Sequence, residues 1–199
     1  RRAIFMATNY GPANNRDSKE AATTPTGVPT SPGIPEHLVT RPCAGGLVVP
    51  WITPVTSTGL YLFGKISHLA QVQCLLRRLC QVCGRRLATP AVLFARSNDL
   101  ANGCTAEPAL CVPCAAYSAR ACPMLSGRRA HYRAGEHPAL AGIPVSIDQA
   151  LRQGSPAGSW FAVWIRDYDV IPHPAEPDTL AASWQRILPL RIQPLTATA

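Results

Sequence analysis

The sequence contains very little lysine and no long hydrophobic run. Lys19 and Lys65 are the only lysines among 199 residues, so arginine supplies almost all of the formal net charge of +8. Pro, Gly or Arg interrupts every apolar stretch well before the roughly 18 consecutive apolar residues that a membrane span requires. We therefore expect a protein that does not insert into a membrane.

Signals for secretion and for two common kinds of active site are also missing. The N-terminal segment RRAIFMATNYG has no apolar stretch of about 7–15 residues before a small-residue cleavage site, which predicts a cytoplasmic protein with Met6 as a candidate natural start. The sequence has neither a Gly-rich phosphate-binding loop nor a Gly-x-Ser-x-Gly elbow. No small-molecule substrate is indicated.

Cysteine, by contrast, is plentiful, and four of the eight cysteines form two Cys-x-x-Cys pairs. Cys80 and Cys83 make the first pair, and Cys111 and Cys114 make the second. Two intervening residues let both thiolates of a pair face one tetrahedral Zn²⁺ at about 2.3 Å, and a second pair completes the coordination shell. We predict structural Zn²⁺ as the cofactor, because a closed shell leaves no position for a substrate.

Disulfides and redox chemistry are the alternatives for these cysteines. An even number fits disulfides, but those are typical of secreted proteins, and neither pair has the βαβ setting of a thioredoxin-like motif. Cys104 and Cys122 flank the second pair and remain candidates to replace one ligand, although neither has a cysteine three residues away. Cys74 is expected to be a buried apolar thiol.

A change of composition near His37 divides the chain. Residues 1–36 include TTPTGVPTSPGIP and few large apolar side chains, so burial cannot offset an ordering entropy of roughly 1–2 kcal/mol per residue. We predict a disordered leader over 1–36 and a single α+β domain over 37–195, and the 47% hydrophobic content is enough for a core.

Two short extended segments and a helix are predicted before the first cysteine pair. GGLVVPWITP is an edge strand or an extended loop because Pro50 cannot donate a ladder hydrogen bond, and GLYLFGK, from Gly59, is a second strand candidate. From Ser67, a suitable N-cap, apolar residues recur at steps of three and four, which predicts an amphipathic helix. Its apolar positions are Leu69, Val72, Leu76 and Leu79.

The two pairs are expected to form a treble-clef-like, zinc-stapled centre over 80–122. Gly84 permits the positive-φ turn in which backbone amides point at the sulfurs of a zinc knuckle. AVLFAR (91–96) predicts a strand, SNDLANG a turn that closes a hairpin, and AAYSARA a helix whose first turn carries the second pair. The positive end of that helix favours thiolates and metal binding.

The C-terminal third reads as a further β element. SWFAVWIRDYDV places Phe161, Val163 and Ile165 on one side of a strand with a period of two residues. HPAEPD predicts a turn, and RILPLRIQPL predicts a return strand.

Treble-clef frames also occur in His-Asn-His nucleases, so an enzyme has to be considered. Those enzymes place a general-base histidine beside the hairpin and a metal-binding histidine on the helix. Neither AVLFARSNDLANG nor AAYSARA contains a histidine, which argues against nuclease activity. Surface or capping roles are the default for the remaining ionisable groups, which are His131, Asp167, Asp169 and His173.

Arginine is concentrated around the cysteine pairs. The stretch from Arg77 to Arg133 is rich in arginine, and its only acidic residues are Asp99 and Glu107. Such a surface suits phosphate contact and base stacking, although a GC-rich genome would enrich arginine on an ordinary solvated surface as well. The residues that we expect to contact a partner are Arg85, Arg86, Arg128, Arg129, Tyr132 and Arg133.

Five segments of the chain resemble a group of uncharacterised small zinc-finger-like proteins of GC-rich Gram-positive bacteria and their phages. The segments are HLVTRP, GGLVVPWITP, RRLCQVCGRRL, EPALCVPCAAYSARACPMLSGRRAHYR and WFAVWIRDY. These segments span roughly residues 37 to 170. The resemblance implies a metal-ligand role for Cys111 and no known activity. A Cys-containing insert that often follows the HYR segment in the group is absent here.

Three functional hypotheses follow from these features. The first is a non-enzymatic zinc-binding module that contacts nucleic acid or a protein partner through its arginine-rich surface. The second is a structural or phage-related scaffold for protein interactions, in which zinc only stabilises the fold. The third and least favoured is a nuclease-type enzyme, which needs a divalent metal site outside the four cysteines.

Overall fold

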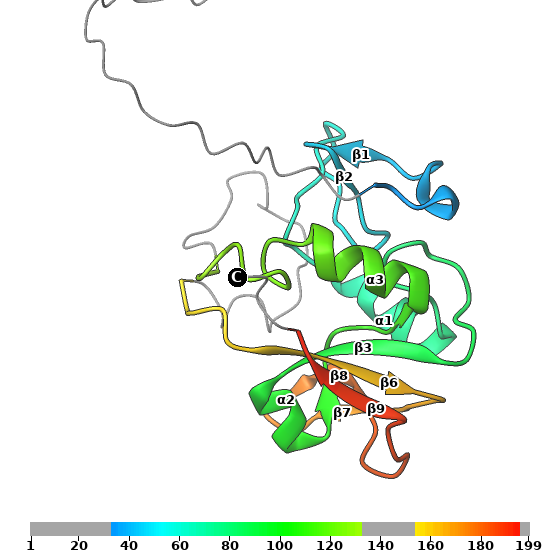
Figure 1. The fold of residues 1–199 in the computed structure, drawn as a ribbon, viewed down its shortest axis with the longest axis vertical. Coiled ribbons are helices and arrows are strands. Elements are labelled where there is room, and N and C mark those ends of the chain that lie inside the picture. Colours follow the sequence, from blue (N-terminus) through cyan, green and yellow to red (C-terminus); the bar gives the residue numbers. More distant parts are fainter. Residues whose placement is uncertain (1–32, 133–153, 196–199) are drawn as a thin grey trace, which may run out of the picture. The chain divides into compact units, whose positions relative to one another are not determined.

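The computed structural model describes residues 33–132 and 154–195, which contain both helices and antiparallel strands (Figure 1). A mixed helix and sheet fold is thereby confirmed. The predicted leader, residues 1–36, lies almost wholly outside the described residues, and its disorder stays a prediction. None of the helices in 33–132 and 154–195 has the length and apolar content to cross a membrane.

The strands within the described residues form three antiparallel sheets. The largest has the strand order β5-β3-β6-β9, from Leu110–Cys111, Ala91–Arg96, Trp160–Ile165 and Arg191–Pro194. The second has the order β4-β8-β7, from Cys104–Thr105, Glu176–Ser183 and Asp169–His173. A two-stranded sheet pairs β1, Cys43–Ala44, with β2, Leu47–Val48.

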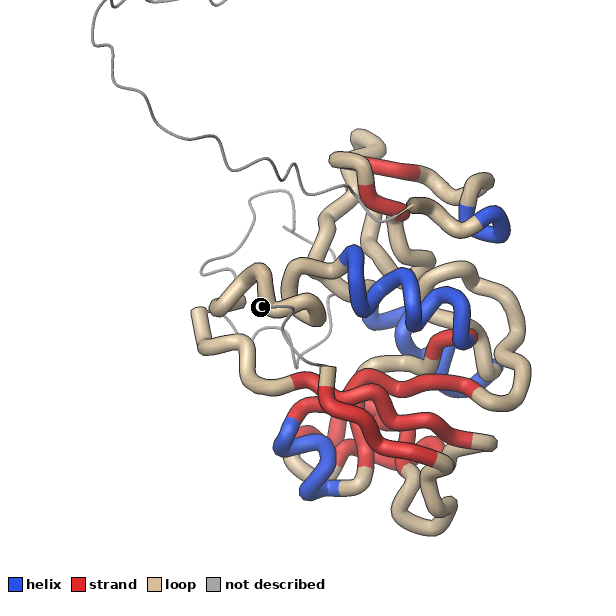
Figure 2. Tube along the Cα trace, in the orientation of Figure 1, coloured by secondary structure: helices blue, strands red, loops and turns tan. Residues whose placement is uncertain are grey.

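The alternating side chains of β3 divide the core into two layers. Val92 and Phe94 face one side, where they pack with residues of helix α3, Val112–Ala121. Figure 2 shows helices beside the strands of the sheet. Leu93 and Ala95 face the other side, where Leu75 of helix α1 and residues of the second sheet cover them. A strand with a period of two residues can be buried on both faces in this way. The larger sheet is therefore the shared wall between two cores.

Helix α1, His68–Arg77, confirms the predicted N-cap but not the predicted buried face. The Ser67 hydroxyl accepts a hydrogen bond from the Ala70 amide at 3.4 Å. Leu69 and Leu76, expected on the inner face, are 68% and 59% exposed. The inner face instead consists of Gln71, Cys74 and Leu75.

Contacts at the end of α1 explain its rotation. Arg78, at the helix C-cap, stacks on the Tyr168 ring with 3.8 Å from Cζ to the ring centroid and pairs with Asp167 at 3.2 Å. The Tyr168 hydroxyl donates to the Leu75 carbonyl at 3.0 Å. These contacts turn Leu75 and Cys74 toward the core. Burial raises the pKa of the Cys74 thiol to about 12, which fits the neutral apolar thiol expected there.

GGLVVPWITP contributes the two-residue strand β2 and continues as a loop, in line with the predicted edge strand or extended loop. Two later segments differ from their predictions. GLYLFGK is not a strand, because Gly59 and Gly64 have positive φ and only an isolated bridge joins Val55 to Tyr61. SNDLANG is the helix α2, Ser97–Asn102, rather than a turn.

The Arg96 amide explains why this segment becomes a helix. It donates to the Asp99 carboxylate at 2.8 Å, and the buried Asp99 also accepts from the Arg96 guanidinium. This half of a capping box satisfies the backbone amide of the N-cap residue, Arg96. As a result, β3 and β5 pair with each other across an intervening helix and strand rather than through a simple hairpin.

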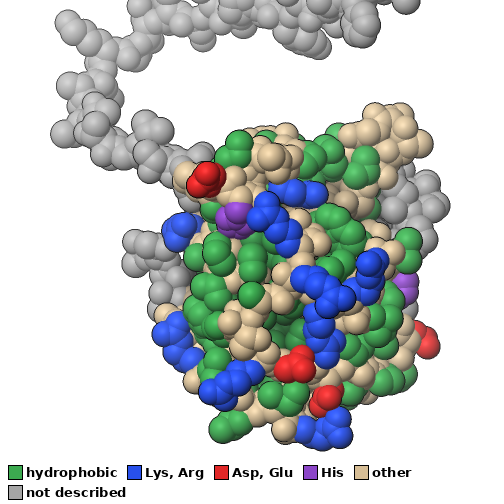
Figure 3. All heavy atoms as spheres, turned by 90° about the vertical axis from the view of Figure 1, so that its right-hand side faces the viewer, with side chains coloured by type: hydrophobic (Ala, Val, Ile, Leu, Met, Phe, Trp, Pro, Cys, Tyr) green, Lys and Arg blue, Asp and Glu red, His purple; other side chains and the backbone are tan. Residues whose placement is uncertain are grey.

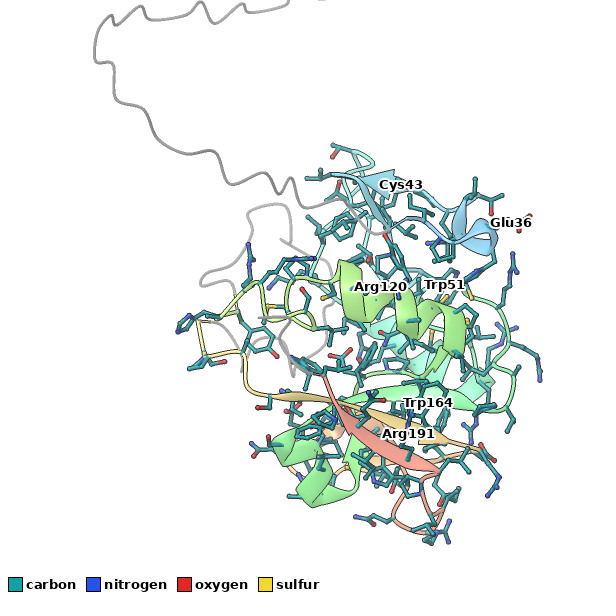
Figure 4. All side chains as sticks on the ribbon, viewed as in Figure 1. Glu36, Cys43, Trp51, Arg120, Trp164 and Arg191 are labelled. Atoms are coloured by element: carbon teal, nitrogen blue, oxygen red, sulfur yellow. The ribbon has the colours of Figure 1, made fainter. Side chains whose placement is uncertain are left out.

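The C-terminal strands follow the alternating pattern. β6 pairs along its whole length with β3, and β9, the predicted return strand, pairs with β6. The predicted turn HPAEPD is shorter than expected because Glu176 already begins β8. At the sheet edge, Arg191 lies over the Trp164 ring with 4.7 Å from Cζ to the centroid (Figure 4).

Candidate metal centre

The four cysteines of the two Cys-x-x-Cys pairs come together in the structure. One sulfur from each of Cys80, Cys83, Cys111 and Cys114 lies within 4.8 Å of the other three. The Cys83 and Cys111 sulfurs are 3.9 Å apart, close to the roughly 3.8 Å edge of a tetrahedron with Zn–S bonds of about 2.3 Å. The sulfurs are therefore spaced as ligands of one metal ion.

The first pair sits on a tight turn. The Gly84 amide donates to the Cys80 carbonyl at 2.8 Å, and the Cys80 amide donates to the Arg85 carbonyl at 2.8 Å. Gly84 has a φ of +73°, which costs a glycine little. The predicted positive-φ turn at Gly84 is thus present.

Two distant segments clamp this turn in place. On one side, the Trp51 and Ile52 amides donate to the Val82 and Gln81 carbonyls at 3.0 and 3.2 Å. On the other, the Gln81 amide donates to the Ala109 carbonyl at 3.1 Å, directly before β5. The knuckle is therefore fixed against the strand that leads to the second pair.

The second pair sits at the start of α3. Cys111 is the N-cap residue and Cys114 lies in the first turn, with Pro113 between them at a position where a missing amide hydrogen costs nothing. The predicted helix with the second pair in its first turn is confirmed. Cys80 and Cys114 are fully buried, while Cys83 and Cys111 are half-buried.

Hydrogen bonds between the sulfurs divide their pKa values. A hydrogen bond from the Cys80 thiol lowers the pKa of Cys83, and one from the Cys114 thiol lowers the pKa of Cys111. The same bonds, Cys111 being the main partner, raise the pKa values of Cys80 and Cys114 above the ordinary range. Four neighbouring sulfurs cannot all be thiolates without a counter-charge, because their negative charges repel. A bound divalent cation supplies that charge and stabilises the thiolates.

The other cysteines lie outside this cluster. Cys104, in β4, and Cys122, at the end of α3, are not among the four grouped sulfurs. Burial raises the pKa of Cys104 to about 11 and also raises that of Cys122, which favours neutral thiols. All eight cysteines, each within the described residues, are free of disulfides.

One residue near the cluster has no signal in the sequence. His37 Nε2 lies 3.1 Å from Cys114 Sγ. The histidine stands 77 positions before its partner, so no ligand spacing links the two. Only the fold brings them together.

The predicted contact residues fall into two groups at opposite ends of α3. Arg85 and Arg86 are exposed beside the knuckle, near the start of the helix, and Arg128 and Arg129 are exposed in the segment after its end. Tyr132 is half-buried and packs against the core. Arg133 lies outside the described residues.

The face turned toward the viewer in Figure 3 shows Arg and Lys side chains spread among apolar ones, with few acidic side chains between them. Acidic groups in the described residues pair with arginines: Asp99 with Arg96, Asp167 with Arg78 and Asp169 with Arg186. On this face the basic side chains are spread out.

The chain matches no protein-family model, no curated protein and no solved structure.

Proposed function

We propose that the protein is a non-enzymatic module built around one structural zinc ion. The convergence of four sulfurs at tetrahedral spacing carries this proposal. The knuckle, the antiparallel pair of β3 and β5, and α3 follow one another in a treble-clef-like order. The resemblance to zinc-finger-like proteins of GC-rich Gram-positive bacteria and their phages agrees with this role. Thiolate ligands stay reduced in the cytoplasm, the location that we propose.

Elemental analysis of freshly purified, reduced protein tests the metal. We expect about one zinc per chain, bound by all four cysteines. Cys80→Ser and Cys114→Ser should lose the zinc and unfold the region around α3, since metal-binding energy is folding energy. Cys43→Ser is the matched control because Cys43 is exposed and lies outside the cluster. Clearly less than one zinc per wild-type chain, or full zinc retention in Cys80→Ser, would contradict the proposal.

We further propose that exposed arginines around this centre contact nucleic acid. Arg77, Arg85 and Arg86 are exposed near the end of α1 and on the knuckle. Guanidinium groups form bidentate hydrogen bonds with phosphate oxygens. The zinc ion would then act on binding only indirectly, by holding the knuckle that presents Arg85 and Arg86.

A gel-shift titration with mixed-sequence DNA and RNA tests this part. Binding should weaken steeply with salt, and replacing both Arg85 and Arg86 with alanine should reduce the slope of log K against log salt on duplex DNA by about two, since each phosphate contact contributes about 0.9. Arg186→Ala is the control, because Arg186 is already paired with Asp169. No shift at low ionic strength rejects nucleic-acid binding. Intact DNA after incubation with Mg²⁺ or Mn²⁺ is also expected.

A protein-binding scaffold is the second candidate, supported by the exposed leucines of α1. Leu69 and Leu76 lie two turns apart and are more than half exposed, which is the pattern of a helix face that receives an apolar partner. A stoichiometric protein recovered with the wild type but not with a Leu69→Gln, Leu76→Gln variant, together with no gel shift, favours this candidate.

A further inference from the structure

His37 extends the candidate metal centre beyond its four cysteines. Its Nε2 atom lies 3.1 Å from Cys114 Sγ. It belongs to the short helix η1, Glu36–Leu38, and the neighbouring Leu38 is fully buried in the same cluster as Cys80 and Cys114. The imidazole is therefore held against the sulfur by the packing of its own segment.

The chemistry of a metal-bound cysteine fixes the direction of this hydrogen bond. A thiolate ligand has no proton to give, so it can only accept, and Nε2 must carry the hydrogen. A Zn²⁺ ion with four thiolates has a net negative charge, which an N–H donor stabilises. Such donors orient metal ligands and tune their basicity.

The segment that carries His37 touches both halves of the centre. On the knuckle side, the Arg85 guanidinium donates to the His37 carbonyl at 3.4 Å. On the α3 side, the Val48 amide donates to the Tyr117 hydroxyl at 3.0 Å. The His37 side chain also reaches a ligand sulfur, that of Cys114, directly.

We propose that His37 donates its Nε2 hydrogen to the Cys114 thiolate and thereby couples metal binding to the docking of residues 36–49. The inference rests on the proposed zinc centre and goes further, because it assigns a positioning role to a residue outside the four ligands. Zinc would then hold the start of the domain in place as well as the knuckle and α3.

The test uses three variants of the full chain. His37→Ala removes the donor, and His37→Gln keeps an N–H donor on a side chain of similar reach. His68→Ala is the matched control, since His68 lies on α1 and is not in the cluster. If His37→Ala lowers the yield of folded protein, His37→Leu keeps the bulk and supplies the same comparison.

Zinc affinity is measured by competition with a chromophoric chelator, and hydrogen exchange of residues 36–49 is measured on the zinc-loaded proteins. We expect His37→Ala to bind zinc about 10–100-fold more weakly, as is typical when a partner of a metal ligand is removed. Its amides over 36–49 should exchange faster than those of the wild type. His37→Gln should recover most of both properties, and His68→Ala should match the wild type.

Cobalt substitution gives a readout that a purely steric role would not change. Loss of the N–H donor should shift the thiolate-to-cobalt charge-transfer band in His37→Ala but not in His68→Ala. Unchanged zinc affinity and exchange in His37→Ala overturn the inference, and so does equal weakening in His37→Gln and His37→Ala. A stronger charge-transfer band per cobalt in His37→Ala would show that the imidazole itself is a ligand, which also overturns it. A wild type without zinc refutes the proposed metal centre instead.

Discussion

Gly84 supports the knuckle of the metal centre because it has no Cβ atom. Its φ of +73° lies in the left-handed region, and an added Cβ would stand 2.6 Å from Cδ1 of the Trp51 ring. The Trp51 amide also donates to the Val82 carbonyl of the knuckle. The glycine thus allows the turn and lets an aromatic ring close over it.

Gly84→Ala is expected to destabilise the protein by about 1–3 kcal/mol, because backbone strain adds to a clash with the Trp51 ring. Gly45→Ala is the matched control, since Gly45 also has a positive φ but nothing within 4 Å of an added Cβ. Urea unfolding in excess zinc measures both, and Gly45→Ala should lose less. Equal losses would mean that the Trp51 contact contributes nothing.

The cysteine ligands and His37 differ in how far the sequence reveals them. Two Cys-x-x-Cys pairs have a spacing that metal chemistry requires, so the cluster could be predicted from local spacing alone. His37 and Trp51 reach the centre through long-range packing and carry no pattern of their own. Their contribution could be found only after folding.

At the scale of elements, α1 shows that a hydrophobic period defines a helix without choosing its inner face. Of the predicted stripe, Leu69 and Leu76 are exposed, whereas Leu79, just after the helix, packs half-buried against the cluster that contains Cys74. The contacts of Arg78 and Tyr168 fix the rotation of the helix. The buried Gln71 amide donates to the Ala106 carbonyl at 2.7 Å, so a polar side chain is accommodated inside.

Leu75→Ala and Leu76→Ala distinguish the two orientations of α1. Leu75 is fully buried, so its truncation should cost about 2–5 kcal/mol. Leu76 is 59% exposed, and its truncation should change stability by no more than about 0.5 kcal/mol. Both residues are neighbours in one helix, so helix propensity cancels in the comparison. Chemical denaturation measures the difference, and a larger loss for Leu76→Ala would place the predicted stripe inside after all.

Element boundaries were harder to predict where capping decides them. SNDLANG has the composition of a turn, yet Asp99 and Arg96 cap it as α2. The strand β8, Glu176–Ser183, escaped prediction because its buried end consists mainly of small residues, Ala181, Ala182 and Ser183. Such residues give little alternating hydrophobic signal.

At the scale of the whole molecule, the cysteine cluster is part of the core rather than an attachment to it. Cys80 and Cys114 are buried in the same cluster as Leu38, Phe94 and Trp160, between α3 and the larger sheet. A metal ion there would join the segment at residues 36–49, the knuckle and α3. Its removal should therefore affect the cooperative unfolding of the domain.

Chelation under reducing conditions is expected to lower the melting temperature by at least about 10 °C. Structural zinc contributes several kcal/mol to folding, and each kcal/mol corresponds to about 2–4 °C in a chain of this size. Calorimetry before and after removal of zinc, confirmed by elemental analysis, measures the change. Cys80→Ser should melt at the same temperature with and without chelator. A wild type whose melting is unchanged after its zinc is gone would show that the metal does not hold the core.

Local chemistry in the sequence determined the two cysteine pairs, the knuckle glycine, the helix α3 that follows Cys111 and the alternating strand β6. Each depends on residues that are neighbours in the chain, where spacing and backbone preference suffice. Tertiary structure alone decided which face of α1 is buried, that β3 is the shared wall of two cores, and that His37 reaches Cys114. These features depend on contacts between segments tens of residues apart, and a local sequence pattern does not predict such contacts.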